Sequence, residues 1–264
     1  MQAKNRGFTL IELITVVVIM SILATLTTSI IRLPITAYFN LQGRSTLVDN
    51  AELALRLMQR DIRRALPNSI RINSSGTALE LLHTTDGGRY RAYPDNSGNG
   101  NILDFTGTDL SFDVIGSLTA APTSGWVVIY NLGQTPANAY NGDNIASLSA
   151  LSTSTSIKLA TATQFPLRSP QQLFYIVDTP ITYGCDTAAG NLLRYSGYSI
   201  TASQVYPPSG VSGQIQANTV KSCVFSYTPG SASRSGLVTI KIILANSNGD
   251  TATLIHEVHV DNAS

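Results

Sequence analysis

The chain of 264 residues contains little charge. Only 12% of its residues are charged, its formal net charge is +1, and 43% of its residues are apolar. This composition is too apolar for a disordered chain and too close to neutral for a dedicated nucleic-acid binder. We therefore expect a folded protein without a nucleic-acid partner.

Residues that build catalytic sites are also scarce. Of three histidines, His83 stands alone, and the chain offers no Ser/His/Asp set and no phosphate-binding loop. His256 and His259 are three residues apart in a predicted strand, where their side chains point to opposite faces. A metalloprotease pair needs histidines four residues apart on a helix. We therefore predict no catalytic residues and no zinc site, and expect a protein that is not an enzyme.

Only two cysteines are present, Cys185 and Cys223, both late in the chain. Two inert thiols are expected if this part of the chain lies in the cytosol, and a disulfide is expected if it lies outside. The compartment decides between the two interpretations, and the N-terminus determines the compartment.

One long apolar run lies near the N-terminus. The basic segment Met1–Arg6 and Gly7 precede 24 apolar or small residues, Phe8–Ile31, with a single acid among them. A helix of this length measures about 36 Å and can cross a bilayer. A secretory signal would have a shorter apolar core followed by an Ala-x-Ala-like site, and the chain has neither. The basic residues predict a single-pass inner-membrane protein with a cytoplasmic N-terminus, which places the cysteines outside and favours a Cys185–Cys223 disulfide.

Glu12 is the one charged residue inside this apolar run. A carboxylate near hydrocarbon costs several kcal/mol when it has no partner, so it is a candidate functional residue. The alternative interpretation is that Glu12 lies shallow enough to reach the lipid head groups. The apolar run alone does not distinguish between them.

The segment Lys4–Leu13 (Lys-Asn-Arg-Gly-Phe-Thr-Leu-Ile-Glu-Leu) resembles the prepilin signature of type IV pilins and type II secretion pseudopilins. The resemblance implies that a prepilin peptidase cleaves between Gly7 and Phe8 and then N-methylates Phe8. It also implies that the apolar helices pack in the centre of a filament. There Glu12 would pair with the Phe8 amine of a neighbour and set the axial register, a known use of buried polar pairs.

Two further segments narrow the resemblance. Glu52–Arg71, and Tyr183–Asp186 followed by Leu193–Tyr198, are similar to minor pilins that include J-type pseudopilins and the O-type protein of mannose-sensitive haemagglutinin (MSHA) pili. This similarity implies a minor pilin that helps to assemble or initiate an MSHA-type pilus. The alternatives are a J-type minor pseudopilin of a type II secretion system and an adhesin subunit displayed at the pilus tip. The implied partners are other minor and major pilins, an inner-membrane assembly platform and a cytoplasmic motor ATPase, and the mature protein could enter an extracellular pilus.

The same reasoning divides the chain into a leader (1–7), a transmembrane and filament-core helix (8–34), an amphipathic helix (35–67) and a periplasmic β-rich domain (68–264). Pro34 is expected to interrupt the helix and to favour a kink, and Pro67 is expected to end it. The predicted apolar stripe consists of Leu41, Val48, Ala51, Leu55, Met58, Ile62 and Ala65. Arg56, Arg60, Arg63 and Arg64 lie largely off this stripe, either as a solvated face or as contacts to an acidic neighbour in a filament.

Short alternating or apolar runs after Pro67 predict strands. They lie at 78–83, 110–115, 126–130, 173–177 and 223–227, and the runs 237–245 and 251–260 predict a hairpin around an Asn-Gly turn. The stretches 93–101, 135–144 and 146–156 are rich in turn residues. The expected fold class is α+β, a long N-terminal helix packed on an antiparallel sheet.

The first turn-rich stretch matches the beginning of a calcium-binding loop. Its candidate ligands alternate along the chain, with a glycine at the sixth position, and a last carboxylate follows: Asp95, Ser97, Asn99, Asn101 and Asp104. The bidentate Glu of such loops is absent, since Thr106 stands in its place. The same residue types form ordinary turns, so the primary expectation is a solvated loop without a cofactor, and calcium is the alternative.

Overall fold

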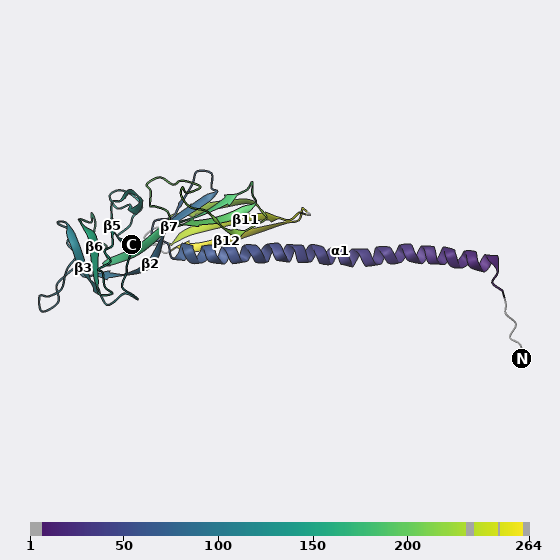
Figure 1. Cartoon of the computed structure of the whole chain (residues 1–264), viewed down its shortest axis with the longest axis horizontal. Coiled ribbons are helices and arrows are strands. Elements are labelled where there is room, and N and C mark those ends of the chain that lie inside the picture. Colours follow the sequence, from purple (N-terminus) through teal and green to yellow (C-terminus); the bar gives the residue numbers. More distant parts are fainter. Residues whose placement is uncertain (1–6, 231–234, 248, 261–264) are drawn as a thin grey trace, which may run out of the picture.

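One long α-helix and two β-sheets make up most of the described part of the protein (Figure 1). The structure, a computed structural model, describes residues 7–230, 235–247 and 249–260. Most of the predicted leader, Met1–Arg6, lies outside the described residues. The predicted fold class is confirmed, because the helix precedes and packs on antiparallel strands.

Helix α1 runs without a break from Leu10 to Arg63, 54 residues. At the usual rise per residue it is about 80 Å long, and Figure 1 shows it leaving the sheets as one rod. The predicted interruption at Pro34 is wrong, since Pro34 lies inside the helix. A proline removes one backbone donor, but helix propagation on both sides is cooperative, so the loss of one hydrogen bond does not end so long a helix.

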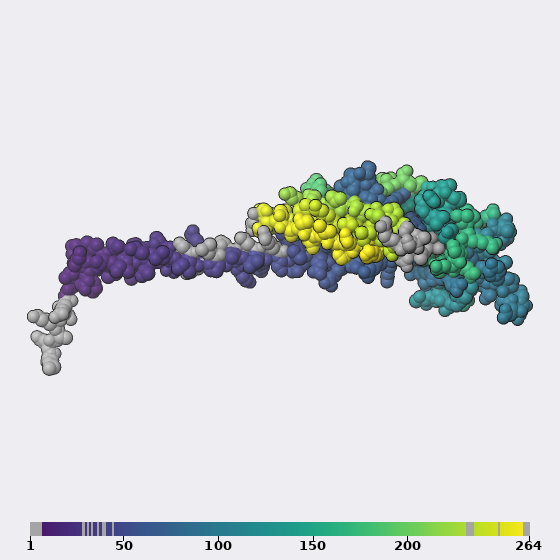
Figure 2. Space-filling model, turned by 180° about the vertical axis from the view of Figure 1, so that it is seen from behind, coloured from purple at the N-terminus to yellow at the C-terminus, as the bar shows by residue number. Residues whose placement is uncertain are grey.

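The sheets cover only the C-terminal part of α1 (Figure 2). Its buried apolar side chains lie on one face of the helix, where each has another three or four residues away: Leu47, Ala51, Ala54, Leu55, Met58 and Ile62. Leu41 and Val48, predicted on this stripe, are 70% and 37% exposed. The buried stripe therefore begins later than the amphipathic pattern predicted, at Leu47.

All strand pairs are antiparallel. The larger sheet has the order β5-β4-β7-β2-β3-β6, with β1 paired to β2, and with β8 joining β7 to β9. Its strands are β1 (Arg71–Ile72), β2 (Ala78–Tyr90), β3 (Asp109–Ile115), β4 (Trp126–Ile129), β5 (Ile145–Ser147), β6 (Ser156–Thr163), β7 (Leu173–Asp186), β8 (Asn191–Ser196) and β9 (Gln214–Ala217). The smaller sheet has the order β10 (Val220–Thr228), β11 (Gly236–Ala245) and β12 (Thr251–Val260).

The predicted strands are present, and the predicted hairpin is confirmed as β11 and β12, paired from Gly236–Val260 to Ala245–Thr251. Strands β2 and β7 are longer than predicted and form the axis of the larger sheet. Strands β1, β5, β6, β8 and β9 were not predicted. Strand β5 and the start of β6 fall in the turn-rich stretch 146–156 or at its edges, where Ser and Thr favour turns in the sequence but pair in the sheet.

The main core lies where the two sheets meet α1. It combines helix residues such as Met58 with Leu81 and Tyr183 of the larger sheet and with Phe225 and Ile240 of the smaller one. A second core, around Phe112 and Phe174, fills the end of the domain far from the helix. The first core therefore holds the helix, and the second builds the distal part of the domain.

Candidate processing and assembly site

The predicted cleavage site lies in an exposed segment just before α1. Residues 7–9 are not helical, and the Phe8 side chain is 76% exposed. Apart from the two chain neighbours of Gly7, no described residue has an atom within 4 Å of where a Cβ of residue 7 would lie. Thr9 is the N-cap residue, with extended backbone. The Gly7–Phe8 peptide bond is thus open to a peptidase, although its cleavage stays a prediction.

Glu12 lies in the first turn of α1 and bonds to the cap. Its Oε2 accepts hydrogen bonds from the Thr9 backbone N–H at 3.4 Å and from the Thr9 hydroxyl at 3.3 Å. The carboxylate also lies at the positive end of the helix dipole. Both hydrogen bonds are long for their type. A subunit on its own thus gives Glu12 a local partner that a neighbour's amine can replace, and the pairing with Phe8 of a neighbour stays a prediction.

The apolar span is bare, meaning that the described part of the domain does not cover it. Its most apolar 18 residues, Leu10–Thr27, have a mean hydropathy of 2.4 and none of them is buried within the protein. The hydroxyls of Ser21 and Thr27 donate to carbonyl oxygens one turn earlier, at 2.7 Å each, so these polar groups are satisfied inside the helix. The span is therefore suited to lipid or to the apolar helices of neighbours.

A buried acid fixes the other end of α1 to the larger sheet. Asp61 is 2% exposed, and its Oδ2 accepts hydrogen bonds from the Tyr183 hydroxyl at 2.9 Å and from Arg194 Nε at 2.8 Å. Arg60 Nε lies 3.5 Å from its Oδ1. Tyr183 comes from β7 and Arg194 from β8, so a helix residue is bound by two neighbouring strands. A buried charge paired in this way is costly to break.

The electrostatics of this cluster follow from its burial. Burial raises the pKa of Tyr183, and the neighbouring Asp61 carboxylate raises it further, so the phenol stays a hydrogen-bond donor. Burial alone would lower the pKa of Arg194, but its hydrogen bond to Asp61 and the charge of that carboxylate outweigh it, and the net shift is upward. The arginine therefore stays charged.

A second buried acid, Glu80 of β2, forms another cluster of polar contacts in the larger sheet. Glu80 is 1% exposed and accepts hydrogen bonds from Arg71 Nε at 2.9 Å and from the Tyr198 hydroxyl at 3.3 Å. The Arg71 guanidinium also stacks on the Tyr140 ring at 3.6 Å and donates to the carbonyls of Thr201 and Ala202. This cluster connects β1 and β2 to the loop after β8.

The segments Tyr183–Asp186 and Leu193–Tyr198, which carry the finer resemblance, thus have physical roles. Tyr183 and Arg194 hold the helix acid, and Tyr198 holds Glu80. Gly184 leaves room for the Tyr206 ring, which any Cβ at that position would overlap. Burial raises the pKa of Tyr206 to about 12.

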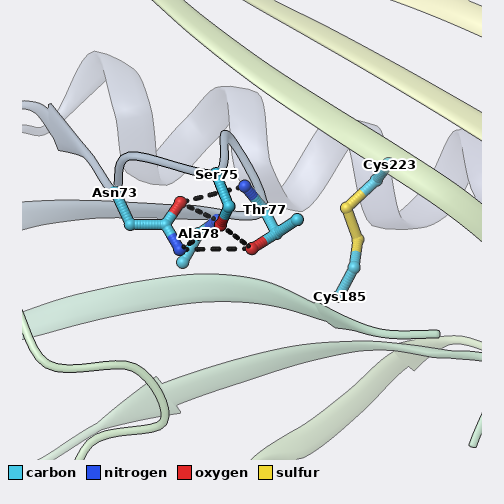
Figure 3. Close-up of a disulfide and its surroundings, with 6 residues drawn as sticks. All are labelled: Asn73, Ser75, Thr77, Ala78, Cys185 and Cys223. Carbon is cyan, nitrogen blue, oxygen red and sulfur yellow. Dashed lines mark hydrogen bonds between the residues drawn. A yellow bond between two sulfur atoms is a disulfide. The ribbon is translucent and has the colours of Figure 1, made fainter. Parts of the chain in front are cut away.

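Cys185 and Cys223 form a disulfide between β7 and β10, with Cα atoms 6.2 Å apart (Figure 3). The turn before β2 lies beside it: Asn73 Oδ1 accepts hydrogen bonds from the backbone N–H groups of Thr77 and Ala78, both at 2.9 Å. Thr77 O accepts from Cys185 N at 3.1 Å, and Gly76 O accepts from Phe225 N at 2.7 Å. The disulfide and this turn therefore connect the two sheets at one place.

Three of the candidate calcium ligands, Asp95, Asn101 and Asp104, have side chains that form hydrogen bonds within their loop or to β3. Asp95 Oδ1 accepts hydrogen bonds from the N–H groups of Ser97 and Asn99, both at 2.8 Å, and these bonds lower the Asp95 pKa. Asp104 Oδ1 accepts from Thr106, and Asn101 Nδ2 donates to Ser111. This is the pattern of Asx turns. Within the described residues no three His, Cys, Asp or Glu side chains form a group that could hold a metal ion. Calcium binding stays a prediction.

Sequence reasoning missed Asp61. The available signal was its place beside Met58 and Ile62, where an acid interrupts the apolar face of an amphipathic helix.

The exposed face of the same helix holds one ion pair between residues four apart. Glu52 and Arg56 form it at 2.6 Å, whereas Asp49 contacts the Ser45 hydroxyl at 3.5 Å.

Comparison with known proteins addresses the N-terminus. The family model of the prokaryotic N-terminal methylation motif matches residues 2–28. The chain carries a prepilin-type methylation motif. No curated protein and no solved structure matches the chain. The motif indicates a protein of the type IV pilin or pseudopilin class, and it implies processing by a prepilin peptidase and association with pilins. The motif and the apolar helix together indicate anchoring in the membrane through the N-terminus.

Proposed function

We propose that this prepilin-type protein is a minor pilin that helps to assemble or initiate a type IV pilus of the MSHA type. The observation that carries the proposal is the N-terminus of α1. An exposed Gly7–Phe8 bond precedes a bare apolar helix in which Glu12 is the one charged residue of the span. The similarity of Glu52–Arg71, Tyr183–Asp186 and Leu193–Tyr198 to minor pilins supports the MSHA assignment.

The proposed function is assembly. Cleavage after Gly7 exposes the Phe8 amine, which becomes a partner for Glu12 of the neighbouring subunit. The span then exchanges lipid for the spans of neighbours, and the domain stays outside the cytoplasm. In a filament interior an unpaired carboxylate is expensive, so the pair favours one axial register over others.

Mass spectrometry of the N-terminus tests the proposal, with protein taken from native membranes and from sheared filaments. A chain that begins at methylated Phe8 in both fractions is expected. A processed chain found in membranes alone would favour the J-type pseudopilin instead. An intact Met1 in cells with an active prepilin peptidase would contradict the proposal.

Gly7→Val provides the matched control. Apart from the two chain neighbours, no described residue has an atom within 4 Å of a Cβ at this position, so the new side chain is expected to leave the fold of the domain unchanged. It crowds the peptide bond that the peptidase must reach. The variant is expected to keep Met1 and to remain in the membrane fraction.

A further inference from the structure

The face of α1 turned away from the sheets carries a stripe of charge. Five charged residues follow one another at spacings of three or four, Asp49, Glu52, Arg56, Arg60 and Arg63, and Leu53 lies between the second and the third of them. These six residues, here called the charged stripe, are all exposed. At 3.6 residues per turn, such spacings place them on one side of the helix. Leu53, in the middle of the stripe, is 62% exposed.

The two signs of charge are separated along this stripe. The acids occupy its N-terminal part and the arginines its C-terminal part. Glu52 and Arg56 pair within the helix. Asp49 accepts a hydrogen bond from the Ser45 hydroxyl at 3.5 Å. Among the described residues, neither Asp49 nor Arg63 has an oppositely charged group within 4.0 Å. The described part of the chain therefore gives no ionic partner to the acid at one end of the stripe, Asp49, or to the base at the other end, Arg63.

The charged stripes of two copies are complementary when the two helices lie parallel and one is shifted along its axis, because the acids of one copy then face the arginines of the other. The parallel arrangement rests on the proposed function, since all spans enter the membrane in one direction. A shift of eleven residues is close to three helical turns, or about 16 Å, so the same face is presented. Asp49 of one copy then lies level with Arg60 of the other, and Glu52 with Arg63.

Shorter shifts that also present the same face of both helices bring like charges together. With a shift of four residues, Arg56 of one copy lies level with Arg60 of the other. With a shift of seven residues, Arg56 of one copy lies level with Arg63 of the other. At eleven residues Arg56 lies level with Ser45, and no arginine opposes another. Opposed like charges are unfavourable and select against the wrong register.

We propose that a second copy of this chain docks on the charged stripe, parallel and shifted by about eleven residues, so that Asp49 and Glu52 of one copy pair with Arg60 and Arg63 of the other. Leu53 is covered in this contact and loses its exposure to water. Each exposed ion pair is weak alone, so the contact selects register and orientation within an assembly that the spans drive.

Cysteine crosslinking of the full-length chain in its membrane tests the register. Both native cysteines are joined in the disulfide, so only introduced thiols react. Two differently tagged copies are produced together, one with Ser45→Cys and the other with Arg56→Cys, the pair that the eleven-residue shift brings level. The control replaces the second variant with Leu53→Cys, on the same face but eight residues from Ser45. The expected yield of mixed dimer is several-fold higher for the first pair, and equal yields would overturn the proposal.

Charge exchange then tests the pairing itself, with the same two reporter cysteines. Glu52→Arg in the Ser45→Cys copy opposes Arg63 of the other copy and should lower the yield about two- to fivefold, as expected for exposed pairs. Arg63→Glu in the Arg56→Cys copy should restore it. If both changes together lower the yield further, the assigned pairing is wrong.

N-terminal mass spectrometry of the same samples separates the two proposals. A chain processed at Phe8 with no preference for the eleven-residue pair contradicts the docking and leaves the proposed function intact. A chain that keeps Met1 contradicts the proposed function.

Discussion

Residues 10–27 and residues 47–63 of α1 share one helical backbone but differ in their surroundings. The first segment is apolar on every side, contains one acid, and has no residue buried within the described part of the protein. The second segment buries one face under two sheets, carries charge on the opposite face and holds a buried acid, Asp61. The apolar surface of the first segment needs lipid or neighbouring subunits to cover it. The apolar face of the second segment is covered by the protein's own sheets.

This difference separates assembly from folding. A change in the bare segment is expected to alter what the subunit joins and to leave the domain folded. A change in the covered segment is expected to alter the stability of the domain before it alters assembly. The predictions below test this separation, beginning with the largest effect.

The largest effect is expected at Glu12. Glu12→Leu removes the one charge of the span, so the protein should still insert but should enter filaments at least tenfold less. The physical reason is that the Phe8 amine of a neighbour loses its partner in an apolar interior. Immunodetection of sheared filaments and membranes measures the ratio. Thermal unfolding of the domain in detergent should not change, and normal incorporation of the variant would refute the assignment.

Asp61→Ala tests the covered segment. It removes one partner from a buried cluster and leaves Arg194 and Tyr183 without their acceptor, which is expected to lower the free energy of unfolding by about 3 kcal/mol or more. Chemical denaturation of the full chain in detergent measures the loss. Glu52→Gln, on the exposed face of the same helix, is the control and should cost less than about 0.5 kcal/mol. A similar cost for both would show that Asp61 does not bind the helix to the sheet.

Replacing both cysteines by alanine tests the connection between the two sheets. On the chain-entropy model, loss of the Cys185–Cys223 bond lowers the free energy of unfolding by about 3–4 kcal/mol. The neighbouring turn of Asn73–Ala78 still joins the sheets, so the domain should keep its fold. Denaturation measures the loss, and circular dichroism checks the fold. Unchanged stability would mean that the turn alone holds the two sheets together.

The sequence predicted the parts of the molecule that depend on local pattern. The apolar span, the amphipathic half, the Asn-Gly hairpin and the α+β class all follow from periodicity and turn residues. Pairs between distant residues could not be predicted in this way. Asp61 and Arg194 are 133 positions apart and meet only because β7 and β8 pass beside the helix. Strand β6 lies at the edge of the sheet order, paired with β3 and joined to Leu148 by a single bridge at Leu159, so its sequence carries a weaker pattern than a central strand.

The smallest effect concerns the pH dependence of stability, and it is expected in the larger sheet. Asp178 on β7 bonds to His83 Nδ1 of β2 at 2.9 Å. Burial alone would raise its pKa, but the hydrogen bond and the charge of His83 outweigh burial and lower it below the usual 3.8. A lowered carboxyl pKa adds stability above the unfolded-state value, and this stability is lost as the pH falls through the folded-state value.

The domain should therefore lose stability below about pH 4 through this pair. Since the Asp178 side chain is 43% exposed, solvent screening keeps the contribution under about 1 kcal/mol. Asp178→Asn should be slightly less stable than the original protein at pH 6 and should match it at pH 3, as measured by denaturation at both values. Other acids, including Asp95 and Asp104 with lowered pKa values, titrate in the same range, so the difference between the two proteins is the quantity to follow. If the difference stays constant between pH 6 and pH 3, the His83–Asp178 contact does not respond to pH.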